Sequence, residues 1–351
     1  MSATDARPLN CKEPHAMGNA IMNLRARPAG ILVLIAALTL VLPAFAGAQT
    51  VQGSFERTLT VSGPVDLDVT TGSGDITVRT GPAGSVRVTG RIRASQSWLG
   101  TGLSAAEKVK AIEAKPPIEQ TSNAIRIGRI EDRELQQNVS ISYEITAPAQ
   151  CALRSHTGSG DQTIGDISGP IEIGSGSGNI ALGAIGGRVD ASTGSGDITA
   201  GAVRGPLSAK SGSGNVRAGG VSGELVVSTA SGDIEVSQAA AGSVRASAAS
   251  GNVRLTGIQG SLRASSSSGD ISVQGTPTGE WQLSSASGNV SVALPQSAGF
   301  DLDARTSSGS IESKHPVTVT GKIERRTLAG KVRNGGPLIK LHTASGDIRI
   351  Q

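Results

Sequence analysis

The chain has 351 residues, of which 48 are glycine and only 2% are aromatic, and its formal net charge is +4. Four basic and two acidic residues lie before residue 49, so the remainder carries +2. There is no basic run and no basic stripe interleaved with aromatic residues, so the composition gives no support to nucleic-acid binding. Small apolar residues at fixed positions among many glycines favour a thin β-solenoid over a disordered chain.

Residues 1–48 have the pattern of a secretory signal peptide. Arg25 and Arg27 precede an apolar run at 30–42, and Ala46-Gly47-Ala48 is a small-residue cleavage site. The apolar run is shorter than the roughly 20 residues of a membrane-spanning helix, which disfavours an uncleaved anchor.

We therefore expect an exported protein whose mature chain starts near Gln49 and has no transmembrane anchor after cleavage. A normal signal peptide would begin at Met22, so we expect the true start there. The expected location is the periplasm, the cell surface or the extracellular space.

Residues 49–150 are expected to form β-rich N-terminal coils that carry a helical insertion at 104–114. Ser104 and Glu107 have capping-box spacing, and Pro116-Pro117 ends the helix. Because the first coil of a solenoid must shield an open sheet edge, we interpret this region as an N-terminal cap. Strands are expected to resume at 124–127 and 139–145.

Residues 151–292 contain a regular repeat in which Ser-Gly is followed by Asp or Asn and then in most units by Ile or Val. From Gly160 to Gly288 the steps between motif glycines are 18, 18, 18, 18, 19, 18 and 19 residues. A fixed period of this size indicates stacked coils. Within each unit small apolar residues alternate with polar ones, as in two short strands with one inward face. We predict an all-β, single-stranded β-helix with coils of about 18 residues, right-handed.

The residue after the motif glycine alternates between aspartate and asparagine. In stacked coils these side chains form one column, in which an Asn between two Asp residues keeps carboxylates apart and can donate its amide to each. We predict a structural role for this column. Its members are Asp161, Asn179, Asp197, Asn215, Asp233, Asn252, Asp270 and Asn289.

Residues 293–351 are expected to form irregular C-terminal coils and a cap. The steps between motif glycines loosen to 21, 21 and 16, and Ser310 and Lys331 break the Asp/Asn column. Asn334-Gly335-Gly336-Pro337 predicts a turn before a last strand region at 338–350.

Calcium binding and hydrolysis are the two chemical alternatives, and neither is favoured. Calcium requires six to eight oxygens, and replacing every second Asp by Asn removes carboxylates. A catalytic pair needs two carboxyls in different environments, whereas Asp161, Asp197, Asp233 and Asp270 occupy equivalent positions. His156, His315 and His342 lack metal-ligand spacing. We therefore predict no enzyme activity, with no catalytic, cofactor-binding or metal residue and no cofactor.

The two tryptophans are expected to have packing roles. Trp281 falls in an inward column, and Trp98 is expected to contact the helix at 104–114. Cys151 is the only cysteine after residue 48, so it cannot form an intramolecular disulfide.

The region 51–351 resembles the bacterial β-strand-repeat proteins of unknown function called the putative adhesin family, which are related to the head domains of autotransporter adhesins. The resemblance rests on Ser142-Tyr143-Glu144-Ile145-Thr146-Ala147-Pro148, the repeated Thr-x-Ser-Gly-Asp-Ile, Phe300-Asp301-Leu302-Asp303-Ala304, and the segment from Gly335 to Ile348. It implies a β-helix and an envelope or extracellular location, and it supplies no catalytic residues.

Three functions remain open. The leading hypothesis is a binding module for a cell-envelope or surface protein or glycan. The alternatives are an envelope scaffold that associates edge to edge, and a carbohydrate-active enzyme. We expect either a monomer or edge-to-edge self-association.

Overall fold

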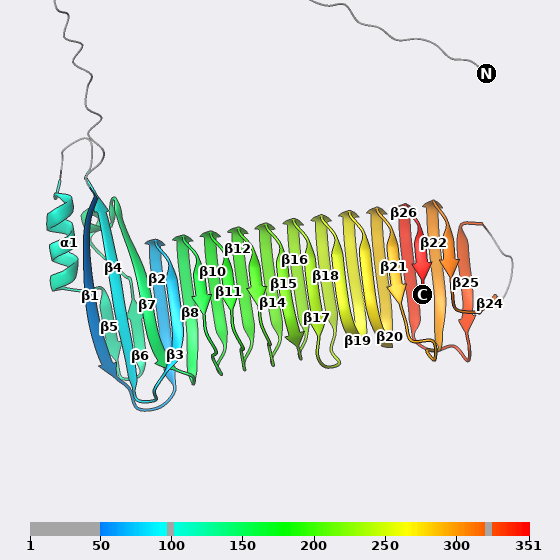
Figure 1. Ribbon diagram of the computed structural model, residues 1–351, viewed down its shortest axis with the longest axis horizontal. Helices are drawn as coiled ribbons and strands as arrows, with labels where there is room; N and C mark the ends of the chain where they lie inside the picture. Colours follow the sequence, from blue (N-terminus) through cyan, green and yellow to red (C-terminus); the bar gives the residue numbers. More distant parts are fainter. Residues whose placement is uncertain (1–49, 97–101, 320–324) are drawn as a thin grey trace, which may run out of the picture. The chain divides into compact units, whose positions relative to one another are not determined.

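The computed structural model describes residues 50–96, 102–319 and 325–351. The described residues form one compact unit, and every named strand among them belongs to one hydrogen-bonded sheet. No helix in the described ranges is both long and apolar enough to cross a membrane. The prediction of an all-β, solenoid-like fold is confirmed, and Figure 1 shows its stacked strands.

The regular coils pair in parallel with a register of 18 or 19 residues. Ile198 lies opposite Val216, and Leu207 lies opposite Leu225. On a third side, isolated parallel bridges join Ile167, Ile185, Val203 and Val221. The strands are β8 Cys151–Ser159, β9 Gln162–Ile164, β10 Ile171–Ser177, β11 Ile180–Leu182, β12 Val189–Ser195, β13 Ile198–Ala200, β14 Leu207–Ser213, β15 Val216–Val221, β16 Leu225–Ser231, β17 Ile234–Gln238, β18 Val244–Ser250, β19 Val253–Ser268, β20 Ile271–Ser287 and β21 Val290–Ala293.

The core consists of the predicted inward columns. Alternate residues of each strand are buried, and Trp281 is fully buried with its Nε1–H donating to the Gly260 carbonyl at 2.9 Å. The packing role predicted for Trp281 is therefore confirmed. Trp98 lies outside the described residues.

The N-terminal part departs from this register. β1 pairs antiparallel with β4, β4 pairs antiparallel with β7, and β2 and β3 join the regular coils through β8 and β9. The elements are β1 Thr50–Thr60, β2 Val65–Ser73, β3 Ile76–Gly81, β4 Ser85–Ser95, α1 Ala105–Ala114, β5 Ile118–Thr121, β6 Ala124–Ile127, α2 Arg133–Gln136 and β7 Val139–Pro148.

Helix α1 begins after the predicted N-cap. The hydroxyl of Ser104 accepts from the Glu107 backbone N–H, and the Glu107 carboxylate accepts from the Ser104 backbone N–H, so the capping box is present. Val109 and Ile112 are buried on the face that packs against β1 and β4. Helix and strand come so close that a Cβ on Gly53 of β1 would lie 2.3 Å from a Val109 methyl.

The last strands of the chain are not the last coil in space. β26 lies between β20 and β22, and β27 lies between β21 and β23 (Figure 1). The C-terminal strands are β22 Phe300–Ser308, β23 Ile311–Ser313, β24 Val317–Val319, β25 Thr327–Val332, β26 Leu338–Ser345 and β27 Ile348–Ile350.

The C-terminal coils therefore do not follow one another in chain order. The regular motif copy at Ser345-Gly346-Asp347 pairs with the regular copy at Ser287-Gly288-Asn289, and the degenerate copy around Ser310 is displaced outward. Lys331 belongs to no motif coil, because β25 runs antiparallel to β22. The predicted turn before β26 is present.

Candidate functional site

The Asp/Asn column is a continuous structural ladder. The Oδ1 atom of each member accepts the backbone N–H of the next member, at 2.9 Å from Asp197 to Asn179 and 2.8 Å from Asn215 to Asp197. The hydrogen bond from the Asn215 backbone lowers the pKa of the Asp197 carboxyl. The column runs through Asp75, Asp161, Asn179, Asp197, Asn215, Asp233, Asn252, Asp270, Asn289, Asp347 and Ser310.

The predicted bonding of the asparagine amides is only half right. Asn215 Nδ2 donates to Asp197 Oδ1 at 3.3 Å, but its Oδ1 accepts from the backbone of Asp233. The amide therefore contacts the preceding aspartate alone. The second contact is made instead by the backbone N–H of the next column member, because stacking places each Asp or Asn side chain beside the corresponding residue of the next coil.

The close approach of the coils explains the motif glycine. A Cβ on Gly232, whose φ is +151°, would lie 2.2 Å from the carbonyl oxygen of Gly214 in the preceding coil. No side chain fits that space, so glycine is required both by conformation and by contact.

A second, buried column was missed at the level of sequence. Two residues before most motif serines, a Ser or Thr hydroxyl donates to the motif-glycine carbonyl of the preceding coil, as from Thr193 to Gly178 at 3.0 Å. The signal was available, because Ser or Thr occupies this inward position in nearly every repeat. The column contains Thr157, Ser175, Thr193, Ser211, Thr229, Ser266, Ser285, Thr343 and Thr306.

The other residues weighed as chemical candidates do not come together. His156 and His342 lie on β8 and β26, and His315 is buried edge-to-face against Phe300 with ring centroids 5.6 Å apart. Burial, with a smaller contribution from Asp66, raises the pKa of the Cys151 thiol to about 12. Within the described ranges, no three His, Cys, Asp or Glu side chains cluster as metal ligands.

The site that breaks the repeat lies in the N-terminal part. β2 and β6 pair from Asp66–Ala124 to Val69–Ile127 and then separate, because Gly128, with φ +93°, turns the chain away. A Cβ on Gly128 would lie 1.7 Å from the Thr70 carbonyl oxygen, so the turn needs glycine. The chain returns to the sheet only at β7.

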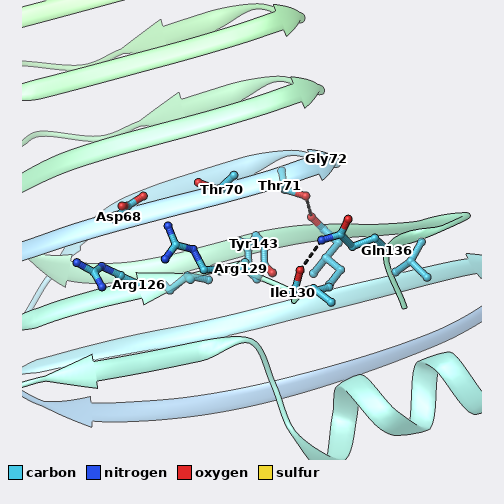
Figure 2. A pocket seen from close by; sticks show the side chains of 13 residues that line it. Asp68, Thr70, Thr71, Gly72, Arg126, Arg129, Ile130, Gln136 and Tyr143 are labelled. Carbon is cyan, nitrogen blue, oxygen red and sulfur yellow. Dashed lines mark hydrogen bonds between the residues drawn. The ribbon is translucent and has the colours of Figure 1, made fainter. Parts of the chain in front are cut away.

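The separation opens a pocket of about 450 Å³, which we call the β2–β7 pocket (Figure 2). Gln136 of α2 closes one end, where its Nε2 donates to the Ile130 carbonyl. Thr71 Oγ1 donates to the Ile141 carbonyl at 2.9 Å and fixes β2 to β7. The lining residues are Asp68, Thr70, Thr71, Gly72, Arg126, Ile127, Gly128, Arg129, Ile130, Gln136, Val139, Ile141 and Tyr143.

The pocket carries positive charge at the end away from Gln136. Figure 2 shows Arg126 and Arg129 there, with Tyr143 between them and Gln136. Both arginines are exposed, and neither forms an ion pair with any residue that the structure describes. Asp68 also lines the pocket, so the three charged side chains sum to +1.

Tyr143 supplies a buried polar atom. The residue is 1% exposed, its ring packs edge-to-face against Phe55 at 6.4 Å, and its hydroxyl has no hydrogen-bond partner among the described residues. Burial raises the pKa of this phenol. The hydroxyl lies against Gly128, since a Cβ on that residue would be 3.3 Å from it.

This pocket was not predicted from the sequence. In the sequence, Tyr143 is part of the motif 142–148 that carries the family resemblance. Arg126 and Arg129 have no feature there that distinguishes them from other exposed charged residues. One signal existed, because Tyr143 is the only tyrosine of the chain.

The fold defines a β-solenoid of stacked 18-residue coils, and residues 187–351 match the family model described as Toastrack DUF4097. The predicted resemblance to a domain family of unknown function is thereby confirmed. The β2–β7 pocket lies before the matched residues. None of the curated proteins matches the sequence.

Solved structures with similar folds are distant. A putative cell adhesion protein from Clostridium sporogenes is 12% identical over 85% of this chain and 99% of its own, with a TM-score of 0.21. A putative lipid binding protein from Parabacteroides distasonis is 15% identical over 69% and 96%, with a TM-score of 0.42. A putative adhesin from Bacteroides fragilis is 14% identical over 85% and 97%, with a TM-score of 0.28. Likeness of this degree supports no functional argument.

Proposed function

We propose that the protein is an exported, non-enzymatic β-solenoid that acts as a binding module at the cell envelope, with the β2–β7 pocket as its binding site. The observation that carries the proposal is the pair Arg126 and Arg129 beside a pocket of about 450 Å³. This volume falls in the range of ligand pockets, and the pocket lies where β2 and β6 separate, outside the regular coils.

The scaffold alternative is supported less. The outer β1 and the β24–β25 pair are antiparallel, and α1 packs on β1, so the parallel ladder does not continue unchanged at either end. We propose that these elements cap the coils, as expected for a solenoid that remains monomeric. We also propose right-handed coils, the hand favoured for parallel crossovers.

The enzyme alternative has one candidate, a second pocket of about 510 Å³ lined by Asp75 and Glu144. General-acid catalysis needs one carboxyl in an apolar environment. Both side chains are exposed, and Glu144 Oε1 is 2.9 Å from Arg91 Nη2 in an ion pair. The pocket therefore supports hydrolysis less than the β2–β7 pocket supports binding.

Export is tested by mass spectrometry of the protein recovered from the cell envelope of a bacterial host. A mature N-terminus at Gln49 supports the proposal, and an intact N-terminal segment in the cytoplasm contradicts it.

Binding is tested by a pull-down from envelope extract, with sedimentation of the protein alone in parallel. The proposal expects monomeric protein to retain a specific component, and Arg126→Ala/Arg129→Ala to lose it. Arg204→Ala, an exposed arginine of the regular coils, is the matched control and should retain it. Concentration-dependent filaments that retain nothing would favour the scaffold.

A further inference from the structure

We propose that the β2–β7 pocket binds a monoanionic amphiphile, a carboxylate on a short apolar chain. The carboxylate lies at Arg126 and Arg129, and the chain contacts the apolar side chains that line the pocket. This inference deepens the proposed function and rests on it, because it names the ligand class of the same site.

The charge of the pocket sets the charge of the ligand. Two guanidinium groups without ion-pair partners in the described residues favour an anion, since charge-assisted bonds from arginine to carboxylate are among the stronger hydrogen bonds. Asp68 in the same lining opposes a second negative charge. A carboxylate matches the sum of +1, whereas a phosphate monoester dianion exceeds it.

The apolar side chains that line the pocket indicate that the rest of the ligand is an alkyl chain. Four aliphatic side chains line the pocket, of which Ile127 and Ile141 are buried and Ile130 and Val139 are partly buried, so part of the wall is apolar. Burying a short alkyl chain against these side chains is favourable because it removes apolar surface from water. A free inorganic anion would leave this surface unused.

The unpartnered hydroxyl of Tyr143 supports the proposal independently of the arginine charges. An unpartnered hydroxyl that is 1% exposed is costly in a folded protein, because a buried donor without an acceptor loses its hydrogen bond to water. A carboxylate oxygen would supply the missing acceptor. A ligand whose carboxylate reaches both the guanidinium groups and the phenol would satisfy them together.

The test uses the single tyrosine as a reporter. The full chain labelled with ¹³Cζ-tyrosine gives one tyrosine NMR signal, which is followed during titration with octanoate, octyl phosphate, octanol and acetate. The proposal expects saturable shifts with octanoate and dissociation constants at least tenfold higher for the other three probes. Arg126→Ala and Arg129→Ala should each weaken octanoate binding tenfold or more, and Arg204→Ala should leave it unchanged.

Tyr143→Phe separates the phenol from the charges. With octanoate binding followed by calorimetry, the variant should bind about fivefold more weakly. The ligand class is overturned if octanoate leaves the Tyr143 signal unmoved, if octanol or octyl phosphate binds as tightly, or if the arginine variants bind octanoate unchanged. If octanoate fails while the envelope pull-down still depends on Arg126 and Arg129, the ligand class is wrong and the binding module stands. If the pull-down also retains nothing, both proposals fall.

Discussion

The regular coils and the two ends of the solenoid are built by different rules. In the coils, neighbours in space are 18 or 19 residues apart in sequence, and each position repeats one chemical role. At the ends, Asp161 lies beside Asp75 and Asp347 lies beside Asn289, which are distant in sequence. The repeated contacts stabilise the fold, and the break at the N-terminal end opens the β2–β7 pocket.

Removing residues 338–351 should have the largest effect. The truncation takes away the buried side chains Ile339, Leu341, Ile348 and Ile350 and leaves β20 and β22 without the strand between them. At about 1.5 kcal/mol for each buried aliphatic side chain, we expect a loss of about 6 kcal/mol or more.

Chemical denaturation measures this loss, and hydrogen exchange should show lost protection from β20 onward. Lys340→Ala is the control within β26, because it removes only an exposed ion pair with Glu280 and should change stability by less than about 0.5 kcal/mol. Unchanged protection of β22 after truncation would contradict the inserted position of β26.

Gly232→Ala tests the close approach in the regular coils. The added Cβ would meet the Gly214 carbonyl oxygen at 2.2 Å, so we expect a loss of about 3 kcal/mol in the free energy of unfolding. Gly219→Ala is the matched control, because its Cβ would meet only Ser237 Oγ at 4.0 Å. Equal effects of the two substitutions would contradict the steric argument.

Asn215→Asp tests the ladder and its pH dependence. The variant places three carboxylates in consecutive coils and removes the amide that donates to Asp197, so we expect a loss of about 1–2 kcal/mol at pH 7. The pKa of Asp197 is lowered by folding, chiefly through the Asn215 backbone N–H.

A lowered folded-state pKa gives stability that is present above the unfolded pKa and is lost as pH falls through the folded value. The native ladder should therefore weaken below about pH 4. The deficit of Asn215→Asp should shrink over the same range, because protonation removes the repulsion. A deficit independent of pH, in denaturation curves from pH 3 to 7, would argue against a charge effect.

Tyr143→Phe should raise stability by about 1 kcal/mol, because it removes a buried hydroxyl without a partner. Thermal denaturation of the unliganded protein measures the gain. A loss of stability would show that the hydroxyl is satisfied within the fold, and would remove one support of the proposed ligand.

Asp75→Asn should have the smallest effect. Asp75 and Asp161 are the one place where two aspartates adjoin in the column as described, so the substitution extends the Asp/Asn alternation by one coil. We expect a gain of about 0.5 kcal/mol at pH 7 that disappears at low pH. Asp270→Asn, which removes a carboxylate that already lies between asparagines, is the control and should show no gain.

Sequence predicted the regular coils well because each feature is local and repeated. The spacing of the motif glycines predicted the register of the coils. The alternation of apolar and polar residues predicted which side chains point inward, including Trp281. The position of β26 was not predicted, because strand order depends on which edges pair rather than on chain order. The regular alternation of Asp and Asn offered a clue, since Asp347 continues the series after Asn289 whereas Ser310 does not.

The pocket could not be predicted for a related reason. Arg126, Arg129 and Tyr143 become neighbours only because Gly128 turns the chain away from β2 and β7 brings it back. No spacing in the sequence predicts that these three residues line one pocket. The capping box of α1 was predictable because its two residues are three positions apart.

The inserted strand also sets the order of folding. The N-terminal coils are made first and can stack without the C-terminal strands. β22 and β25 can pair early as an antiparallel unit, but β22 obtains its parallel neighbour only when β26 has been made. The C-terminal coils therefore become complete only after β26 and β27 have been made.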